Sequence, residues 1–126
     1  MSDPDQVLAK VRAATTRALE NMTCLCVSEG GRTPVATCKH CHGSGYLVTD
    51  ETICARVALA MVEQCEWHRR ETESCTMTAA QHMREARGTF GAAARSPYAE
   101  RYACMAGAHS EAADRILSAL RTAVGE

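Results

Sequence analysis

Four cysteines in the first third of the 126-residue chain have a spacing that can bind a metal ion. They form two close pairs, Cys24 with Cys26 and Cys38 with Cys41, joined by a segment that contains glycine and proline. Tetrahedral zinc takes four ligands, with sulfur at about 2.3 Å, and two short turns that face each other provide them. Four thiolates leave no position for a catalytic water, so we expect one structural zinc ion. An iron–sulfur cluster uses the same ligands and stays open as the alternative.

A second group of metal-binding residue types follows in the middle of the chain. Cys65 and His68 are three residues apart, a spacing that places both on one face of a helix. Cys75 and His82 come next, and the four residues together are candidates for a second metal site. The alternative is that Cys65 is a core thiol and His82 is solvated, because buried free cysteines are common.

One stretch of the first cysteine group resembles a known family. Residues 38–45 read Cys-Lys-His-Cys-His-Gly-Ser-Gly, which is similar to the CxxCxGxG element of the DnaJ-type zinc module and of lambda-type phage Q antiterminators. The DnaJ-type module binds extended polypeptide, and the Q antiterminators act on the promoter and on RNA polymerase. The resemblance implies zinc ligation by Cys38 and Cys41, whereas the segment around Cys24 and Cys26 departs from the element in spacing and glycines.

Composition excludes several classes of function. The net charge is −1, with 14 basic and 15 acidic residues, so the chain lacks the basic excess of a general phosphate-binding protein. Residues 30–49 contain no acid and form a weakly basic exception. The first residues lack an apolar signal region, and no apolar run reaches the roughly 18 residues of a membrane span. We therefore expect a cytoplasmic protein without membrane contact, where paired cysteines bind metal more often than they form disulfides.

Capping signals and apolar periods predict a mainly α-helical fold in a single domain, residues 1–126. About four helices are expected, with a zinc-stapled loop or short β-hairpin at about residues 24–47 between the first two. The predicted helices span 3–22, from Thr49 or Asp50 to about 71, 78–90, and from Ser96-Pro97 to about 124. Two further expectations are a short strand at 33–37 and a polar break at 72–76.

The expected side-chain positions follow from the same periods. Cys54 lies on the apolar stripe of the second predicted helix, while Cys104 lies off the stripe of the last. His109 lies on the stripe of the last helix and is expected to be a hydrogen-bonded core residue. The whole stripe runs through Tyr98, Tyr102, Met105, His109, Ala113, Ile116, Leu120 and Val124. The chain has no GxSxG, P-loop, GxGxxG or HExxH motif, and we expect no enzyme.

These features favour a small zinc-stabilised regulator or protein–protein interaction module, of the kind that phages and mobile elements encode. Lys39, His40, His42 and Tyr46 are the residues expected to contact a partner protein. The alternative is a transcription regulator of antiterminator type that contacts DNA or RNA polymerase. A peptide-holding chaperone and a thiol oxidoreductase using Cys38 and Cys41 are further alternatives. Alanine-rich helices would also suit a homo-oligomer.

Overall fold

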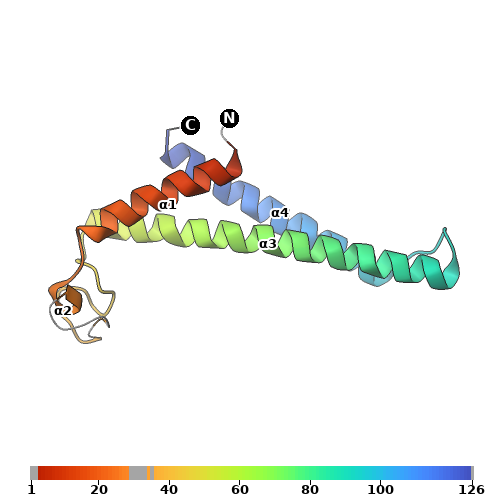
Figure 1. Cartoon of the computed structure of the whole chain (residues 1–126), viewed down its shortest axis with the longest axis horizontal. Coiled ribbons are helices and arrows are strands. Elements are labelled where there is room, and N and C mark those ends of the chain that lie inside the picture. The colour runs from red at the N-terminus through yellow and green to blue at the C-terminus, as the bar shows by residue number, and fades with distance from the viewer. Residues whose placement is uncertain (1–2, 29–33, 35, 126) are drawn as a thin grey trace. The chain divides into compact units, whose positions relative to one another are not determined.

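The computed structural model describes residues 3–28, 34 and 36–125 and is mainly α-helical (Figure 1). Its helices are α1 (Pro4–Glu20), α2 (Leu25–Ser28), α3 (Asp50–Phe90) and α4 (Pro97–Ala123). Within the described residues, pairing of extended backbone is limited to one antiparallel bridge between Thr23 and Tyr46. The predicted fold class is confirmed, with the cysteine loop between α1 and α3. Of the predicted strand at 33–37, Ala36 and Thr37 form a turn, whereas Thr33 and Val35 lie outside the described residues.

Each long helix begins at a cap that the sequence indicates. Asp3, Thr49 and Ser96 each accept a hydrogen bond from a backbone amide of the first turn, which would otherwise have no partner. At α3 the cap is reciprocal, because the Thr52 hydroxyl also accepts from the Thr49 amide at 3.0 Å. Local side-chain chemistry therefore determines where α1, α3 and α4 start.

The α3 helix is uninterrupted, and the predicted break at residues 72–76 is wrong. The Thr72 hydroxyl donates to the His68 carbonyl at 2.9 Å, and that of Thr76 donates to the Thr72 carbonyl at 2.7 Å. These bonds satisfy the hydroxyls inside the helix, so they do not compete with its backbone. Cys75 is buried at 4% exposure, which anchors the segment by packing. The second and third predicted helices are therefore one.

The chain divides into two compact units, Met1–Val62 with Leu120–Glu126, and Glu63–Ala119. The first unit has a core of aliphatic side chains together with the buried hydroxyls of Thr15 and Thr52. Its buried apolar residues include Val7, Leu8, Val11, Leu19, Val62 and Leu120. Cys54 is exposed, which corrects its expected place in a core. Among the described residues, no helix is both long enough and apolar enough to cross a bilayer.

The second unit is a helical hairpin in which the later part of α3 pairs with α4 through small side chains. Ala99, Ala106 and Ala113, spaced seven residues apart, are buried, whereas Tyr98 and Met105 are 64% and 40% exposed. The predicted apolar stripe of α4 is thus displaced by one residue at Tyr98 and Met105, whereas Ala113 and Leu120, which belong to it, are buried as expected. Alanine at the contact lets two helices approach closely, and large side chains then lie at its margins. The same close approach brings polar side chains of α3 and α4 together.

Candidate metal centre

The four cysteines of the first unit meet at one point. The sulfur atoms of Cys24 and Cys38 lie 3.7 Å apart, and those of Cys26 and Cys41 lie 3.6 Å apart. All four sulfurs are within 4.8 Å of one another. Ligands at 2.3 Å in a tetrahedron are separated by about 3.8 Å, so the observed spacing suits a single ion. The same spacing is far beyond a disulfide bond of about 2.05 Å, and all eight cysteines are free.

Backbone hydrogen bonds hold the two cysteine turns in position. The His42 amide donates to the Cys38 carbonyl at 2.9 Å, and the Ser44 amide donates to the Cys41 carbonyl at 3.0 Å. The two turns are joined by the Cys24 amide, which donates to the Gly45 carbonyl at 2.8 Å. The sulfurs are therefore directed by main-chain geometry rather than by long flexible side chains.

Gly43 and Gly45 are required by this loop. Both have φ of +84°, a left-handed conformation that disfavours residues with a Cβ. A Cβ on Gly43 would lie 3.3 Å from the Ala36 backbone, and one on Gly45 would lie 3.1 Å from the Pro34 side chain. The two glycines of the Gly-Ser-Gly sequence thus allow a turn that brings backbone amides close to the sulfurs.

The four thiols differ in how readily they ionise. At Cys41, burial opposes ionisation, but amides of Gly45 and Gly43 and neighbouring thiols outweigh it and lower the pKa to about 7. Backbone amides of Cys41 and His40 likewise lower the pKa of Cys38. At Cys24 the Cys26 amide favours the thiolate, yet burial and three adjacent thiols raise the pKa to about 12. The two thiols of the CxxC turn are therefore more acidic than the Cys24 thiol.

The arrangement can hold one metal ion in a closed coordination shell. Cys24 and Cys41 are each only 1% exposed, and Cys26 and Cys38 are half-buried. Thiolate ligands and tetrahedral spacing suit Zn²⁺, which has no redox chemistry of its own and serves in such sites to hold a fold together. Four protein ligands leave no vacant position for a substrate on such an ion.

The predicted partner-binding residues lie on the outside of this loop with one exception. Lys39, His40 and His42 are exposed, whereas Tyr46 is half-buried and its amide donates to the Ser44 hydroxyl at 3.2 Å. Leu25, which is not among the predicted contact residues, is 64% exposed between two of the cysteines. Its position between two predicted metal ligands, Cys24 and Cys26, is the sequence feature that indicates a side chain displayed by the loop.

The predicted second metal set is not one site. Because α3 is continuous, Cys65 and His82 are separated along its axis by about 25 Å, so no single ion reaches both. Cys65 is a core thiol whose pKa is raised by burial, and it donates to the Ala113 carbonyl at 3.6 Å. His82 stacks on Tyr98 and Tyr102, each at 5.6 Å between ring centroids.

Cys75 instead lies with residues that the sequence analysis did not pair with it. Ligand atoms of Glu71, Cys75 and His109 are all within 4.8 Å of one another. His109 is half-buried and hydrogen-bonded to His68 through their Nδ1 atoms at 2.9 Å. The expected hydrogen bond of His109 is thus observed, with a partner from α3.

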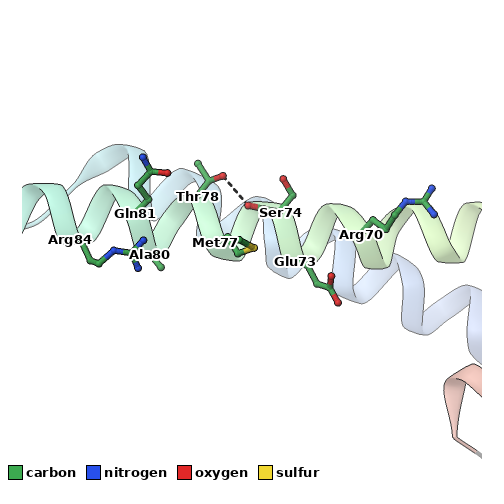
Figure 2. A pocket seen from close by; sticks show the side chains of 8 residues that line it. All are labelled: Arg70, Glu73, Ser74, Met77, Thr78, Ala80, Gln81 and Arg84. Atoms are coloured by element: carbon green, nitrogen blue, oxygen red, sulfur yellow. Dashed lines mark hydrogen bonds between the residues drawn. The ribbon is translucent and has the colours of Figure 1, made fainter.

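A shallow depression also lies on α3 (Figure 2). Its side chains all come from this helix, with Met77 at the centre and Arg70 and Arg84 toward the ends. The Thr78 hydroxyl is bonded to the Ser74 carbonyl at 2.9 Å rather than directed at a ligand. Cysteine and histidine are absent from the lining of this depression, which is an exposed helix face.

Comparison of the chain with models of protein families, with curated proteins and with solved structures found no significant match. The likeness to the DnaJ-type element therefore rests on residues 38–45 alone, and the observed cysteine cluster supports its metal-binding part.

Proposed function

We propose that the protein is an interaction module that binds another protein, and that the zinc ion of its four-cysteine site is structural rather than catalytic. One observation carries the proposal: the turn that holds the cysteine cluster displays an exposed leucine. Leu25 lies between Cys24 and Cys26, so metal binding by these two cysteines fixes its backbone on both sides. A rigid, exposed aliphatic side chain loses little entropy when a partner covers it.

Other exposed apolar side chains of the first unit support the proposal. Leu47 and Val48 directly follow the cysteine loop and are exposed, as are Ile53 and Val57 in the first two turns of α3. Isolated exposed apolar residues are ordinary, whereas several in neighbouring segments mark contact surfaces. Exposed Lys39 and His40 supply the polar rim that such surfaces have.

A pair of matched variants tests this function. Leu25→Asp places a charge on the metal-bound turn, and Phe90→Asp does the same at an 80% exposed position of the second unit. Wild type and Phe90→Asp are expected to retain the same protein from an extract of the source cells, and Leu25→Asp is expected to lose it at unchanged zinc content. Equal retention by all three proteins, or retention of nothing by any, would reject the proposal.

A regulator that contacts DNA is the second candidate, and the exposed Lys39, His40 and His42 on the acid-free segment favour it. Phosphate contacts release counterions, so binding of duplex DNA would weaken steeply with salt. Loss of one such contact in Lys39→Ala would reduce the slope of log K against log salt by about 0.9. The absence of binding at low salt would remove this candidate.

A further inference from the structure

We propose a second metal site in the helical hairpin of residues 63–119, with Glu71, Cys75 and His109 as ligands of one Zn²⁺-like ion. Glu71 and Cys75 come from adjacent turns of α3, and His109 comes from α4. Their ligand atoms already lie within 4.8 Å of one another. This site is separate from the four-cysteine cluster, and the inference is independent of the proposed function.

The donor set selects the class of ion. Sulfur, imidazole nitrogen and carboxylate oxygen are the three kinds of ligand that zinc uses, whereas Mg²⁺ and Ca²⁺ take oxygen almost alone. Ligands of one tetrahedral zinc ion are separated by about 3.3–3.7 Å, according to the bond lengths of zinc to nitrogen, oxygen and sulfur. Small side-chain rotations therefore suffice to close the observed group around an ion.

Burial distinguishes this group from an incidental surface cluster. Cys75 is 4% exposed, and Glu71 and His109 are half-buried. Removal of a carboxylate from water is unfavourable unless a cation or hydrogen-bond donors compensate it. A divalent ion would compensate Glu71 and the Cys75 thiolate together.

His68 completes the arrangement as a partner of His109. Their Nδ1 atoms are 2.9 Å apart, which is shorter than the roughly 3.3 Å between two nitrogens bound to the same zinc ion. A histidine that ligates metal through one ring nitrogen characteristically forms a hydrogen bond through the other. His68 therefore orients His109, and the three ligands leave the fourth position to water.

An ion at this position would link α3 to α4 within the hairpin. The alanine contacts of that hairpin bury little area per residue, so a cross-link between the helices would add to its stability. Zinc that binds the folded hairpin and not the unfolded chain raises the midpoint of unfolding, by an amount that grows with the logarithm of its affinity.

Trp67 provides a reporter for this site. It is the only tryptophan in the sequence, and its ring meets those of His68 and His109 edge-on, at centroid distances of 4.8 and 5.3 Å. A paramagnetic ion such as Co²⁺ bound beside His109 would quench tryptophan fluorescence. The part of the thiolate-to-cobalt absorption that is lost in Cys75→Ser would report the cysteine ligand, beside the larger band of the four-cysteine site.

The experiment is a Co²⁺ titration of metal-free full-length protein, followed by fluorescence and absorption, with zinc content measured separately. Wild type is expected to bind two ions per chain, with quenching of Trp67. Cys75→Ser should retain one ion and lose the quenching, with an affinity loss greater than the 10–100-fold typical of an outer hydrogen-bond partner. His68→Gln should weaken binding by about 10–100-fold.

Cys65→Ser is the matched control, because Cys65 is a buried thiol on the same helix outside the proposed group. It should behave as wild type. Glu71→Gln tests the site without change of a buried thiol, and it should weaken quenching while circular dichroism stays unchanged. One ion per chain in wild type, or quenching that survives in both Cys75→Ser and Glu71→Gln, would overturn the proposal.

Discussion

The thiols of the four-cysteine site hold their protons unequally, and this difference predicts a pH dependence of metal binding. Cys41 has a pKa of about 7, whereas that of Cys24 is about 12, because burial and adjacent thiols outweigh the Cys26 amide. At neutral pH the metal-free site therefore retains the Cys24 proton. A thiol must lose its proton to bind zinc, so protons compete with the ion.

The apparent zinc affinity should consequently rise with pH. For each proton displaced, we expect about a tenfold gain per pH unit between about pH 6 and 8. Competition with a chelator of known affinity measures this, in Cys75→Ser so that only the four-cysteine site is titrated. Calorimetry in buffers of different ionisation enthalpy counts the released protons independently. An affinity that does not change with pH would contradict the raised pKa of Cys24.

Removal of one ligand should destabilise the first unit strongly. Cys38→Ser and Cys41→Ser should each lower the free energy of unfolding by more than about 3 kcal/mol, because zinc binding contributes directly to folding. Cys104 is exposed on α4, and Cys104→Ser should change stability by less than about 0.5 kcal/mol. Thermal unfolding of the three zinc-loaded variants provides the comparison. Equal midpoints would show that the cluster binds no structural metal.

Two glycines, one in the cysteine loop and one in α4, should respond to substitution by alanine with opposite changes in the free energy of unfolding. Gly45→Ala should cost about 1–2 kcal/mol, because φ is +84° and the added Cβ would meet Pro34. Gly107 lies inside α4 with open space around its Cα, so Gly107→Ala should stabilise by about 0.5–1 kcal/mol. Urea unfolding measures both variants. Stabilisation by Gly45→Ala would contradict the left-handed turn.

At the level of the elements, the continuity of α3 through residues 72–76 makes a definite prediction. Ser74→Pro should cost about 3 kcal/mol or more, because proline removes a helical hydrogen bond and clashes with the preceding turn. Ser74 is exposed, so Ser74→Ala is the control and should be close to neutral. Chemical unfolding compares the two. A tolerated proline would indicate a linker at this point, as the sequence first suggested.

The helix starts could be predicted from the sequence, whereas the course of α3 could not. Caps are local: Asp3, Thr49 and Ser96 act on amides two or three residues away. The segment 72–76 has the composition of a linker, yet its threonine hydroxyls bond within the helix and Cys75 is buried. The hydrogen bonds that these hydroxyls form inside the helix cannot be predicted from composition alone.

The two candidate metal sites also differ in whether they can be predicted from local sequence. Cys38 and Cys41 are close in sequence, and their turn places both sulfurs, so the spacing alone indicates a ligand pair. Glu71 and His109 lie on different helices and meet only when α3 pairs with α4. That pairing depends on buried alanines, of which Ala99 and Ala106 lie one position away from the predicted stripe. Sequence spacing therefore identified the local site and missed the one built by tertiary packing.

At the scale of the whole molecule, each of the two compact units contains a candidate metal-binding group of its own. The four cysteines belong to the unit of residues 1–62 and 120–126, and the Glu71 group belongs to residues 63–119. The backbone hydrogen bonds of the two cysteine turns lie within the loop, and the Leu47 amide at its end donates to the Met22 carbonyl just after α1. Loss of the ion from the four-cysteine site should therefore weaken the hydrogen bonds of the cysteine loop.

Hydrogen exchange of backbone amides tests this separation. In Cys38→Ser, the amides of Cys24, His42 and Ser44 should lose protection by at least about 100-fold, because their carbonyl partners are held by the metal-bound turns. Amides of α4 at 106–117 should keep their wild-type rates in the same sample. Cys75→Ser reverses the expectation, with faster exchange in α4 and an unchanged loop. Parallel loss of protection in both regions in either variant would show that the two units unfold together.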